Sequence, residues 1–303
     1  NIVDSESVAE AIRRAVKRAG TKTTDVAVAI SGDAAITKII QLPASLSASD
    51  IEGQVELQAD QYIPFPMEEV RHDFEVIGPN ARDEEMLDVL LVATRTENVE
   101  QRQAAVESAG LRGRVMDVES FALENACRLL THQMPDNGVN ATVAVVDFGA
   151  SSTTFSVLRN MKVVYTRDFA FGGQQLTEEI MRTYGLSMED AGRAKKEGGL
   201  PSNYEPEVLD PFIDDMCQQV SRSLQFFLAA GGGREQPDQI IVCGGCANIP
   251  GVDELIASRV GIPTVIGDPL GQMKVSSRAK SQGVKKDATA LLTALGLALR
   301  SFD

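Results

Sequence analysis

The sequence predicts a two-lobed α/β protein whose first lobe carries an inserted α+β unit. The chain has 303 residues, which exceeds a typical single domain and is enough to bury a sizeable core in each of two lobes. Strand-like and helix-like segments alternate along it. Residues 35–112 run in the order strand, helix, strand, strand, helix, so we expect them to close into a compact unit of their own.

The chain is expected to begin with a surface helix and a strand. Apolar residues recur every four positions after Asp4, Ser7 and Glu10 have the spacing of a capping box, and Gly20 is placed to end the helix. Apolar residues then alternate through Asp25–Ile30, which predicts a strand.

Proline and glycine separate the elements expected in the inserted unit. Pro43 follows its first strand, Pro64 and Pro66 end its first helix, and Gly110 stops its second helix. The expected elements are two helices and three strands, namely Ala35–Leu42, Ser49–Tyr62, Val70–Ile77, Met86–Ala93 and Thr96–Ala109.

The second lobe is predicted to follow a helix at Glu119–Thr131 and a polar linker at Pro135–Gly138, where we place the lobe boundary. The glycines Gly231–Gly233 are expected to end its longest helix. Its strands and helices are expected at Val143–Phe148, Thr154–Leu158, Lys162–Arg167, Leu176–Tyr184, Met188–Lys196, Phe212–Ala229, Ile240–Cys243 and Ala288–Leu299.

Composition and charge exclude several classes of function. The formal net charge of −14 and the pI near 4.7 disfavour binding to nucleic acid or to an anionic membrane surface. No apolar run approaches the roughly 20 residues that cross a bilayer, so no direct membrane insertion is expected and a cytoplasmic location follows by default. Four cysteines are too few for a disulfide framework in a chain of this length, which indicates reduced thiols.

The clearest motif runs from Asp147 to Thr153, where a core strand turns into a hairpin. A tight turn at Gly149 lets backbone N–H groups approach phosphate oxygens, and the hydroxyls at Ser151, Ser152 and Thr153 add donors. A carboxylate at the end of the strand is able to hold a hydrated Mg²⁺ ion. A polar turn without a ligand is nonetheless the commoner meaning of a lone acid-x-Gly motif.

A second motif follows the strand Ile240–Cys243. Gly244 and Gly245 have no side chains, so a flat adenosine could lie against the backbone there, next to the start of the following helix. The alternative is an ordinary strand-to-helix loop. The acid-Gly hairpin, the pair Gly172–Gly173 before a helix and the Gly-Gly loop occur in the order typical of the second lobe of the actin and sugar-kinase fold.

Several short segments of the sequence point to one family within this fold. The chain resembles the PilM family of type IV pilus assembly proteins, which belongs to the actin-like ATPase superfamily (RNase H-like fold) and is related to the cell-division protein FtsA. The resemblance spans essentially the whole chain and is most specific at Gln61–Pro66, Leu91–Arg95, Ala109–Leu111, Val118–Leu123 and Val146–Ser151.

The resemblance implies a division into a remainder of the first subdomain at 1–34, the inserted subdomain at 35–112, a linker helix at 113–137 and the second lobe at 138–303. Within that lobe it implies a core at 138–186 and 238–286, a helical subdomain at 187–237 and a C-terminal crossing helix at 287–303.

The resemblance also implies ATP or ADP with Mg²⁺ as the cofactor. Asp147 would hold Mg²⁺ through water, Lys195 would approach the purine or ribose, and Glu119 is a weak candidate for a carboxylate near the attacking water. The implied cofactor-binding residues are Asp147, Gly149, Ser151, Ser152, Thr153, Gly172, Gly173, Lys195, Gly244, Gly245 and Asn248.

The implied partners are the short N-terminal cytoplasmic tail of a PilN-like membrane protein and other components of the pilus inner-membrane complex. The tail would bind beside the inserted subdomain, at Tyr62, Ile63, Pro64 and Phe65, and an acidic wall would favour basic residues in it. This would hold the protein at the inner membrane for pilus assembly and twitching motility.

The sequence departs from the family pattern in ways that should weaken nucleotide binding. The phosphate turn has Ala150, Ser151 and Ser152 in place of glycines and Thr, and Gly192 stands where an acid is expected before Lys195. No strand-Asp-x-Gly element precedes the helix near Ser5, so we expect the chain to be N-terminally incomplete and to bind nucleotide weakly or not at all.

Other functions stay open or are set aside. The alternatives are an ATP-hydrolysing, filament-forming actin homologue in cell division and a sugar or acetate kinase of the same superfamily. The Cys243-x-x-Cys246 spacing is interpreted as incidental, because no second such pair or thioredoxin-like unit accompanies it. The sequence has no P-loop motif and no strand followed by a dinucleotide-binding glycine motif.

Overall fold

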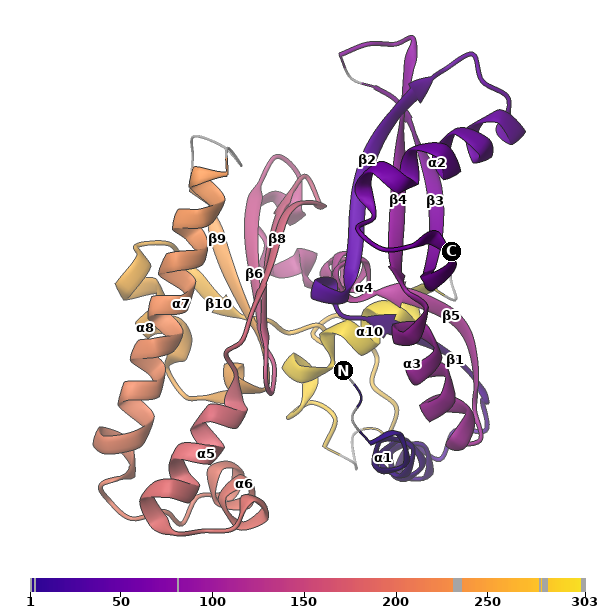
Figure 1. Ribbon diagram of the computed structural model, residues 1–303. Helices are drawn as coiled ribbons and strands as arrows, with labels where there is room; N and C mark the ends of the chain where they lie inside the picture. The colour runs from indigo at the N-terminus through magenta and orange to yellow at the C-terminus, as the bar shows by residue number, and fades with distance from the viewer. Residues whose placement is uncertain are drawn as a thin grey trace. The chain divides into compact units, whose positions relative to one another are not determined.

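The computed structural model describes residues 2, 4–80, 82–230, 236–277, 279 and 283–300. By its internal contacts the chain divides into two units, residues 1–119 and 120–303. Its strands and helices are shown in Figure 1. The predicted helix end at Gly231–Gly233 lies outside the described residues.

The first unit contains a parallel pair of strands, β1 and β5, with the helix α3 packed beside them and the helix α1 packed on α3. The helix α1 is capped by the carboxylate of Asp4, which accepts the N–H groups of Glu6 and Ser7, so the predicted capping role of Ser7 is wrong. Gly20 ends α1 in the left-handed conformation, as predicted. The elements are α1 (Ser5–Ala19), β1 (Asp25–Ile30), α3 (Thr96–Ser108) and β5 (Arg112–Val118).

The inserted unit is a three-stranded antiparallel sheet in the order β2-β4-β3 with one helix, α2, packed on it. Ile51, Val55 and Ala59 of α2 are buried against Val89 and Leu91 of the central strand. Ser47 and Asp50 form a capping box at the start of α2. The elements are β2 (Ala35–Pro43), α2 (Ala48–Tyr62), β3 (Val70–Pro79) and β4 (Met86–Arg95).

The second unit is built on a five-stranded sheet in the order β10-β9-β6-β7-β8. The strands β6, β7 and β8 form the predicted antiparallel meander, while β9 lies parallel to β6 and to β10. The strands are β6 (Thr142–Phe148), β7 (Thr153–Arg159), β8 (Lys162–Phe169), β9 (Gln239–Gly244) and β10 (Thr264–Ile266).

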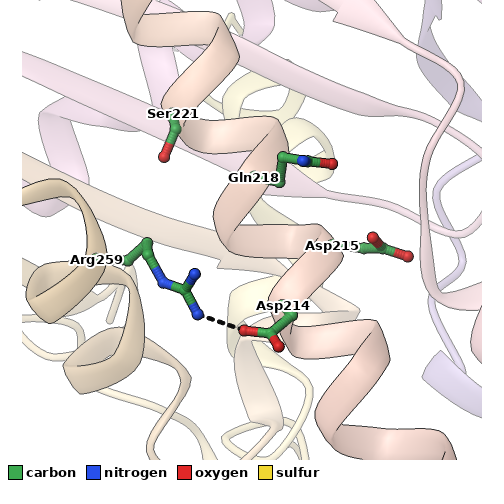
Figure 2. Close-up of a pocket in the computed structure, with 5 residues that line it drawn as sticks. All are labelled: Asp214, Asp215, Gln218, Ser221 and Arg259. Carbon is green, nitrogen blue, oxygen red and sulfur yellow. Dashed lines mark hydrogen bonds and ion pairs between the residues drawn. The ribbon is translucent and has the colours of Figure 1, made fainter.

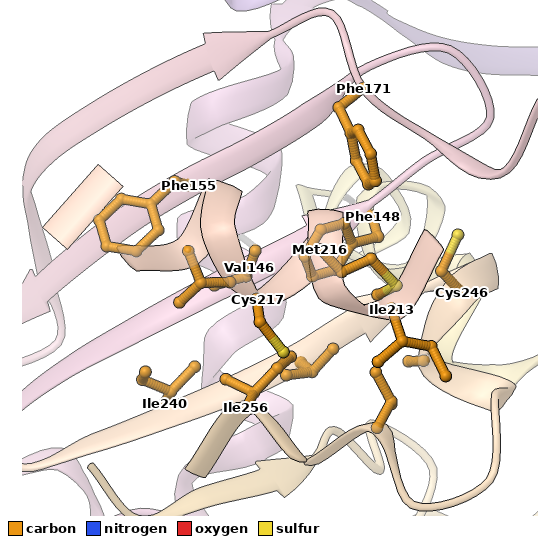
Figure 3. Packing of buried hydrophobic residues seen from close by; sticks show 14 of the residues in the cluster. Val146, Phe148, Phe155, Phe171, Ile213, Met216, Cys217, Ile240, Cys246 and Ile256 are labelled. Carbon is orange, nitrogen blue, oxygen red and sulfur yellow. The ribbon is translucent and has the colours of Figure 1, made fainter. Parts of the chain in front are cut away.

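Helices cover both faces of this sheet. On one face, Phe148, Phe155 and Ile240 pack against Met216 and other apolar residues, forming the larger core (Figure 3). On the other face, apolar residues of α4 and α10 pack against the sheet. The helices are α4 (Glu119–Cys127), α5 (Gly173–Tyr184), α6 (Met188–Glu197), α7 (Asp210–Ala229), α8 (Val252–Val260) and α10 (Leu292–Leu299).

The helix α4 explains where the contact boundary falls. Leu123, Ala126 and Cys127 are fully or almost fully buried in the second unit's core, together with Val143 and Val145 of β6. Burying these side chains ties the helix to the sheet that follows it in sequence. The division by contacts therefore lies after residue 119, and not in the polar segment at 135–138.

Candidate functional site

The two glycine-containing motifs meet at one edge of the second unit's sheet. The strands β6 and β9 are parallel neighbours, with Asp147 opposite Cys243 and Phe148 opposite Gly244. Ligands of open α/β sheets bind beyond the carboxyl ends of such strands. The acid-Gly turn after β6 and the Gly-Gly loop after β9 therefore lie next to each other, so one ligand could contact both.

Gly244 permits this close approach, and Gly245 leaves space beside it. Gly244 has φ +85°, and a β-carbon there would lie 2.2 Å from the carbonyl oxygen of Phe148 and 2.6 Å from Oδ1 of Asp147. A side chain at this position is therefore incompatible with the observed backbone. A β-carbon at Gly245 would have no neighbouring atom within 4 Å, so the backbone there is open to a flat ring.

The turn after β6 contains three exposed residues, Ala150, Ser151 and Ser152. Gly149 closes it by donating its N–H to the carbonyl of Ser152 at 3.0 Å. Within the part of the chain that the structure describes, the exposed residues Ala150, Ser151 and Ser152 have no hydrogen-bond acceptor for their backbone N–H groups. Consecutive N–H groups in a turn are able to bind an anion, so these three groups are the candidate donors for a phosphate.

The start of α5 holds this turn in place. The N–H of Gly173 donates to the carbonyl of Gly149 at 3.0 Å, and the N–H of Gln174 donates to the carbonyl of Ala150 at 2.8 Å. A β-carbon at Gly172 would lie 2.5 Å from the carbonyl oxygen of Ala150, so only glycine allows the contact. The first N–H groups of the helix thus bind the turn's carbonyls, and they are not the donors that would meet a phosphate.

The side chain of Thr153 faces the protein interior and not the solvent. Its side chain is fully buried, and its hydroxyl donates to the carbonyl of Phe171 at 2.8 Å. The three hydroxyls predicted to donate to phosphate therefore differ. Ser151 and Ser152 are exposed at the turn, whereas the Thr153 hydroxyl links β7 to the segment before α5.

Lys195 lies against the start of α5. Its Nζ donates to the carbonyl of Gly173 and to Oγ1 of Thr177, both at 2.7 Å. Its pKa is lowered, mainly because partial burial disfavours the charged ammonium, although nearby Cys246 acts in the opposite direction. Two of the three ammonium donors are used, which leaves one for a ligand. Thr177 was missed from the sequence, although it follows Gly173 by one helical turn.

The remaining predicted nucleotide residues lie at the same edge. Asp147 is half-buried near the end of β6, and its charge adds to burial, the main cause, in raising the pKa of the Cys243 and Cys246 thiols. Asn248 is exposed, and its side-chain amide donates to the carbonyl of Gly245 at 3.4 Å. Among the described residues, no group of three or more His, Cys, Asp or Glu side chains could hold a metal ion directly.

The cysteines near this edge are buried. Burial raises the pKa of Cys127 to about 12, that of Cys246 to about 11, and that of Cys243 well above its usual range. Thiols that stay protonated at neutral pH are poor nucleophiles and poor metal ligands.

These thiols predict a loss of stability at alkaline pH. Because an unfolded thiol ionises near pH 8.5 and these buried thiols ionise near 11 or above, the folded state keeps protons that the unfolded state releases. Stability should therefore be complete below about pH 8 and fall as pH rises from about 8.5 towards 11. The lowered pKa of Lys195 opposes this effect.

Urea unfolding followed by circular dichroism between pH 8 and 10.5 measures the effect. The variant Cys246→Ala should show a smaller fall in the unfolding midpoint than the parent chain, because one raised thiol is removed. A midpoint that rises with pH over this interval would show that Lys195 dominates.

The other predicted residues belong to the first unit. Glu119 is half-buried at the first position of α4, directly after β5. In the segment after α2, Ile63 is buried in the inserted unit's core, whereas Tyr62 and Phe65 keep 40% and 38% of their side chains exposed. The guanidinium of Arg95 lies 5.5 Å from the centre of the Phe65 ring. Their roles as catalytic or partner-binding residues stay predictions.

A separate surface cavity of about 270 Å³ lies between α7 and α8. Figure 2 shows that its residues come from these two helices, with Asp214 paired to Arg259 at 2.5 Å. The cavity is lined by Asp214, Asp215, Gln218, Ser221 and Arg259. Both partners of the ion pair are exposed, so it contributes little stability, and the cavity shares no residue with the glycine-rich edge.

Known proteins are similar to this chain over most of its length. A family model described as type IV pilus assembly protein PilM matches residues 1–302. A solved PilM–PilN type IV pilus biogenesis complex is similar at a TM-score of 0.80 and 28% identity, over 99% of this chain and 86% of that chain.

Two more distant proteins are also similar. The cell division protein FtsA of Bacillus subtilis is 26% identical over 159 residues, which are 42% of this chain and 35% of FtsA. The chain thus spans about a third of the length of that curated relative. The ADP-bound MreB5 of Spiroplasma citri has a TM-score of 0.50 at 12% identity, over 98% of this chain and 75% of that chain, and this likeness shows the actin-like fold alone.

Proposed function

Since the chain belongs to the PilM family of type IV pilus assembly proteins, we propose that it is a nucleotide-binding assembly protein that binds the N-terminal cytoplasmic tail of a PilN-like membrane protein. The observation that carries the proposal is the whole-length likeness to the PilM–PilN complex. Through this partner the protein would act at the cytoplasmic side of the inner membrane. No helix in the described part of the chain is long and apolar enough to span a bilayer.

The proposed nucleotide site is the edge formed by the turn after β6 and the loop after β9. The N–H groups of Ala150, Ser151 and Ser152, which have no acceptor among the described residues, would bind phosphate oxygens, and Asp147 would hold hydrated Mg²⁺. The open backbone at Gly245 would receive the adenosine, and Lys195 has one ammonium donor left for the ribose or purine.

Calorimetry with ATP and Mg²⁺ tests this site. The phosphate donors identified here come from one turn, so we expect a Kd weaker than about 1 µM. The variant Asp147→Asn should weaken MgATP binding by about tenfold, because a charge-assisted interaction with the hydrated ion is lost. Asp214→Asn removes a carboxylate from the separate cavity and should change the affinity by less than about twofold. Sub-micromolar binding, or equal effects of the two variants, would contradict the prediction.

The proposed tail site is the segment Tyr62–Phe65. The buried Ile63 anchors this segment, and the exposed rings of Tyr62 and Phe65 offer apolar contact area at a low cost in conformational entropy. Exposed Glu68 and Glu69 come three and four residues after Phe65 and would favour a tail that carries basic residues.

A labelled peptide with the sequence of the cognate PilN-like tail tests this site by fluorescence anisotropy. We expect Phe65→Ala and Tyr62→Ala each to weaken binding by about fivefold or more, as for aromatic anchors of interfaces. The control Leu57→Ala removes another exposed apolar side chain of the inserted unit, 68% exposed, and should leave binding within about twofold. Peptide binding that is unaffected by the aromatic variants would place the tail elsewhere.

Hydrolysis of ATP is the alternative to a binding role. Glu119 is the carboxylate that the sequence singles out for it, and steady ATP turnover that Glu119→Gln abolishes would favour this alternative. Without such turnover, nucleotide acts as a conformational ligand only.

A further inference from the structure

A second cavity, of about 360 Å³, lies where the second half of α7 meets the end of β8. It shares no residue with the glycine-rich edge or with the cavity between α7 and α8. Arg167 and Phe169 line it from β8, and the residues from α7 are Gln219, Arg222, Ser223 and Phe226.

The cavity concentrates positive charge in a chain with a net charge of −14. Among the described residues, neither the guanidinium of Arg167 nor that of Arg222 has a carboxylate within ion-pair distance. The cavity between α7 and α8 differs in this respect, because its arginine, Arg259, is paired with Asp214. Two arginines beside one cavity, neither with an acidic partner in the described part of the chain, supply the donors that recognise an anionic group.

An aromatic wall completes the cavity. The guanidinium of Arg167 lies 3.6 Å from the centre of the Phe226 ring, and Phe226 as a residue is 47% exposed. This cation–π contact holds Arg167 in a defined orientation while its edge N–H groups stay able to donate. The site thus offers fixed donors for a carboxylate next to an apolar surface for a neighbouring side chain.

The strand that carries Arg167 is also the last strand of its sheet. In the described part of the chain β8 pairs with β7 on one side and with no strand on the other. Such an edge presents unpaired backbone N–H and C=O groups, which bind an extended peptide by adding it as a further strand. The free edge and the arginines lie next to each other, because Arg167 belongs to both.

We propose that this surface binds an extended acidic segment of a protein partner, which pairs with the free edge of β8 and places a carboxylate between Arg167 and Arg222. A nucleic acid or an anionic membrane is a poorer fit, because two arginines cannot offset the repulsion between a polyanion and a chain of charge −14. The site lies in the second unit, and its test requires neither a nucleotide nor the PilN-like tail.

The test uses the full chain and a fluorescein-labelled peptide, Thr-Glu-Val-Glu-Val-Glu-Thr, whose binding is followed by anisotropy at low salt. We expect saturable binding that is about tenfold tighter than that of the same peptide with glutamine in place of glutamate. Arg167→Gln and Arg222→Gln should each weaken binding by about tenfold. Hydrogen exchange should show new protection of the backbone amides of β8 when the peptide is bound.

The matched control is Arg259→Gln, which removes the same charge from the other cavity and should change the affinity by less than about twofold. Equal weakening by Arg259→Gln would mean that only net charge matters and would overturn the site. No binding at about 1 mM peptide, or tighter binding to an anionic vesicle or a single-stranded oligonucleotide, would also overturn it. Peptide binding without protection of β8 would overturn the strand pairing.

Discussion

Replacement of Gly244 by alanine is expected to destabilise the second unit by about 2–4 kcal/mol and to abolish nucleotide binding. A β-carbon there would lie 2.2 Å from the carbonyl oxygen of Phe148, and the φ of +85° is unfavourable for any residue with a side chain. The clash is with backbone, and Phe148 is itself paired with Gly244 between two central strands, so neither chain is able to move away cheaply. Urea unfolding followed by circular dichroism measures the loss.

The neighbouring glycine supplies the control. A β-carbon at Gly245 would meet nothing within 4 Å, so Gly245→Ala should keep the unfolding free energy within about 0.5 kcal/mol of the parent chain. If Gly245 lies under an adenosine, the added methyl group should still weaken MgATP binding. Equal unfolding midpoints for Gly244→Ala and the parent chain would contradict the prediction, because they would show that β6 and β9 move apart at little cost in free energy.

The largest loss of stability is expected for Gly296→Ala, at about 3 kcal/mol or more. Gly296 lies in α10, and a β-carbon there would be 1.7 Å from the carbonyl oxygen of Ala122 and 2.5 Å from its carbonyl carbon. The two helices approach so closely that only a hydrogen fits between them. To accept the methyl group, α10 would have to move away from the core that Leu123 and Leu292 help to form.

Gly192→Ala is the matched variant, since Gly192 also lies inside a helix of the same unit, α6, but has no atom within 4 Å of a β-carbon. Alanine there should stabilise the chain by about 0.5–1 kcal/mol, because glycine loses more conformational entropy in a helix. Thermal unfolding of the two variants side by side should therefore shift in opposite directions. Shifts of the same sign would show that the contact between α10 and α4 relaxes.

Most elements were predictable because their signals are local. The strands of the meander and the helix Phe212–Ala229 carry clear periodicity, and the structure confirms them with shifts of one or two residues. Two strands were missed. The strand β10 (Thr264–Ile266) has only three residues. The strand β5 (Arg112–Val118) contains two arginines and a glycine before its apolar end, which hides the pattern of a strand. It forms because β1 offers it a parallel partner along its whole length.

The glycine-rich edge was also predictable, for a similar reason. Strand, acid, glycine and hydroxyl residues occur in one short segment, and Gly244 and Gly245 directly follow a buried strand. The sequence could not separate the roles of the hydroxyls, because the burial of Thr153 depends on the carbonyl of Phe171, eighteen residues along the chain. Nor could it pair Arg167 with Phe226, which lie on a strand and a helix.

By itself, the sequence determined the family, the order of most elements and the two glycine-containing motifs that follow core strands, because periodicity and short motifs depend on neighbouring residues. Tertiary structure alone decided that the Asp147 carboxylate lies where a side chain at Gly244 would be, and that Gly296 has no room for a side chain. It also decided that Arg167 and Arg222 line one cavity beside the last strand of the described sheet. These features depend on the register of neighbouring parallel strands and on the distance between packed helices. Contacts between segments that are far apart in the sequence produce no pattern among neighbouring residues.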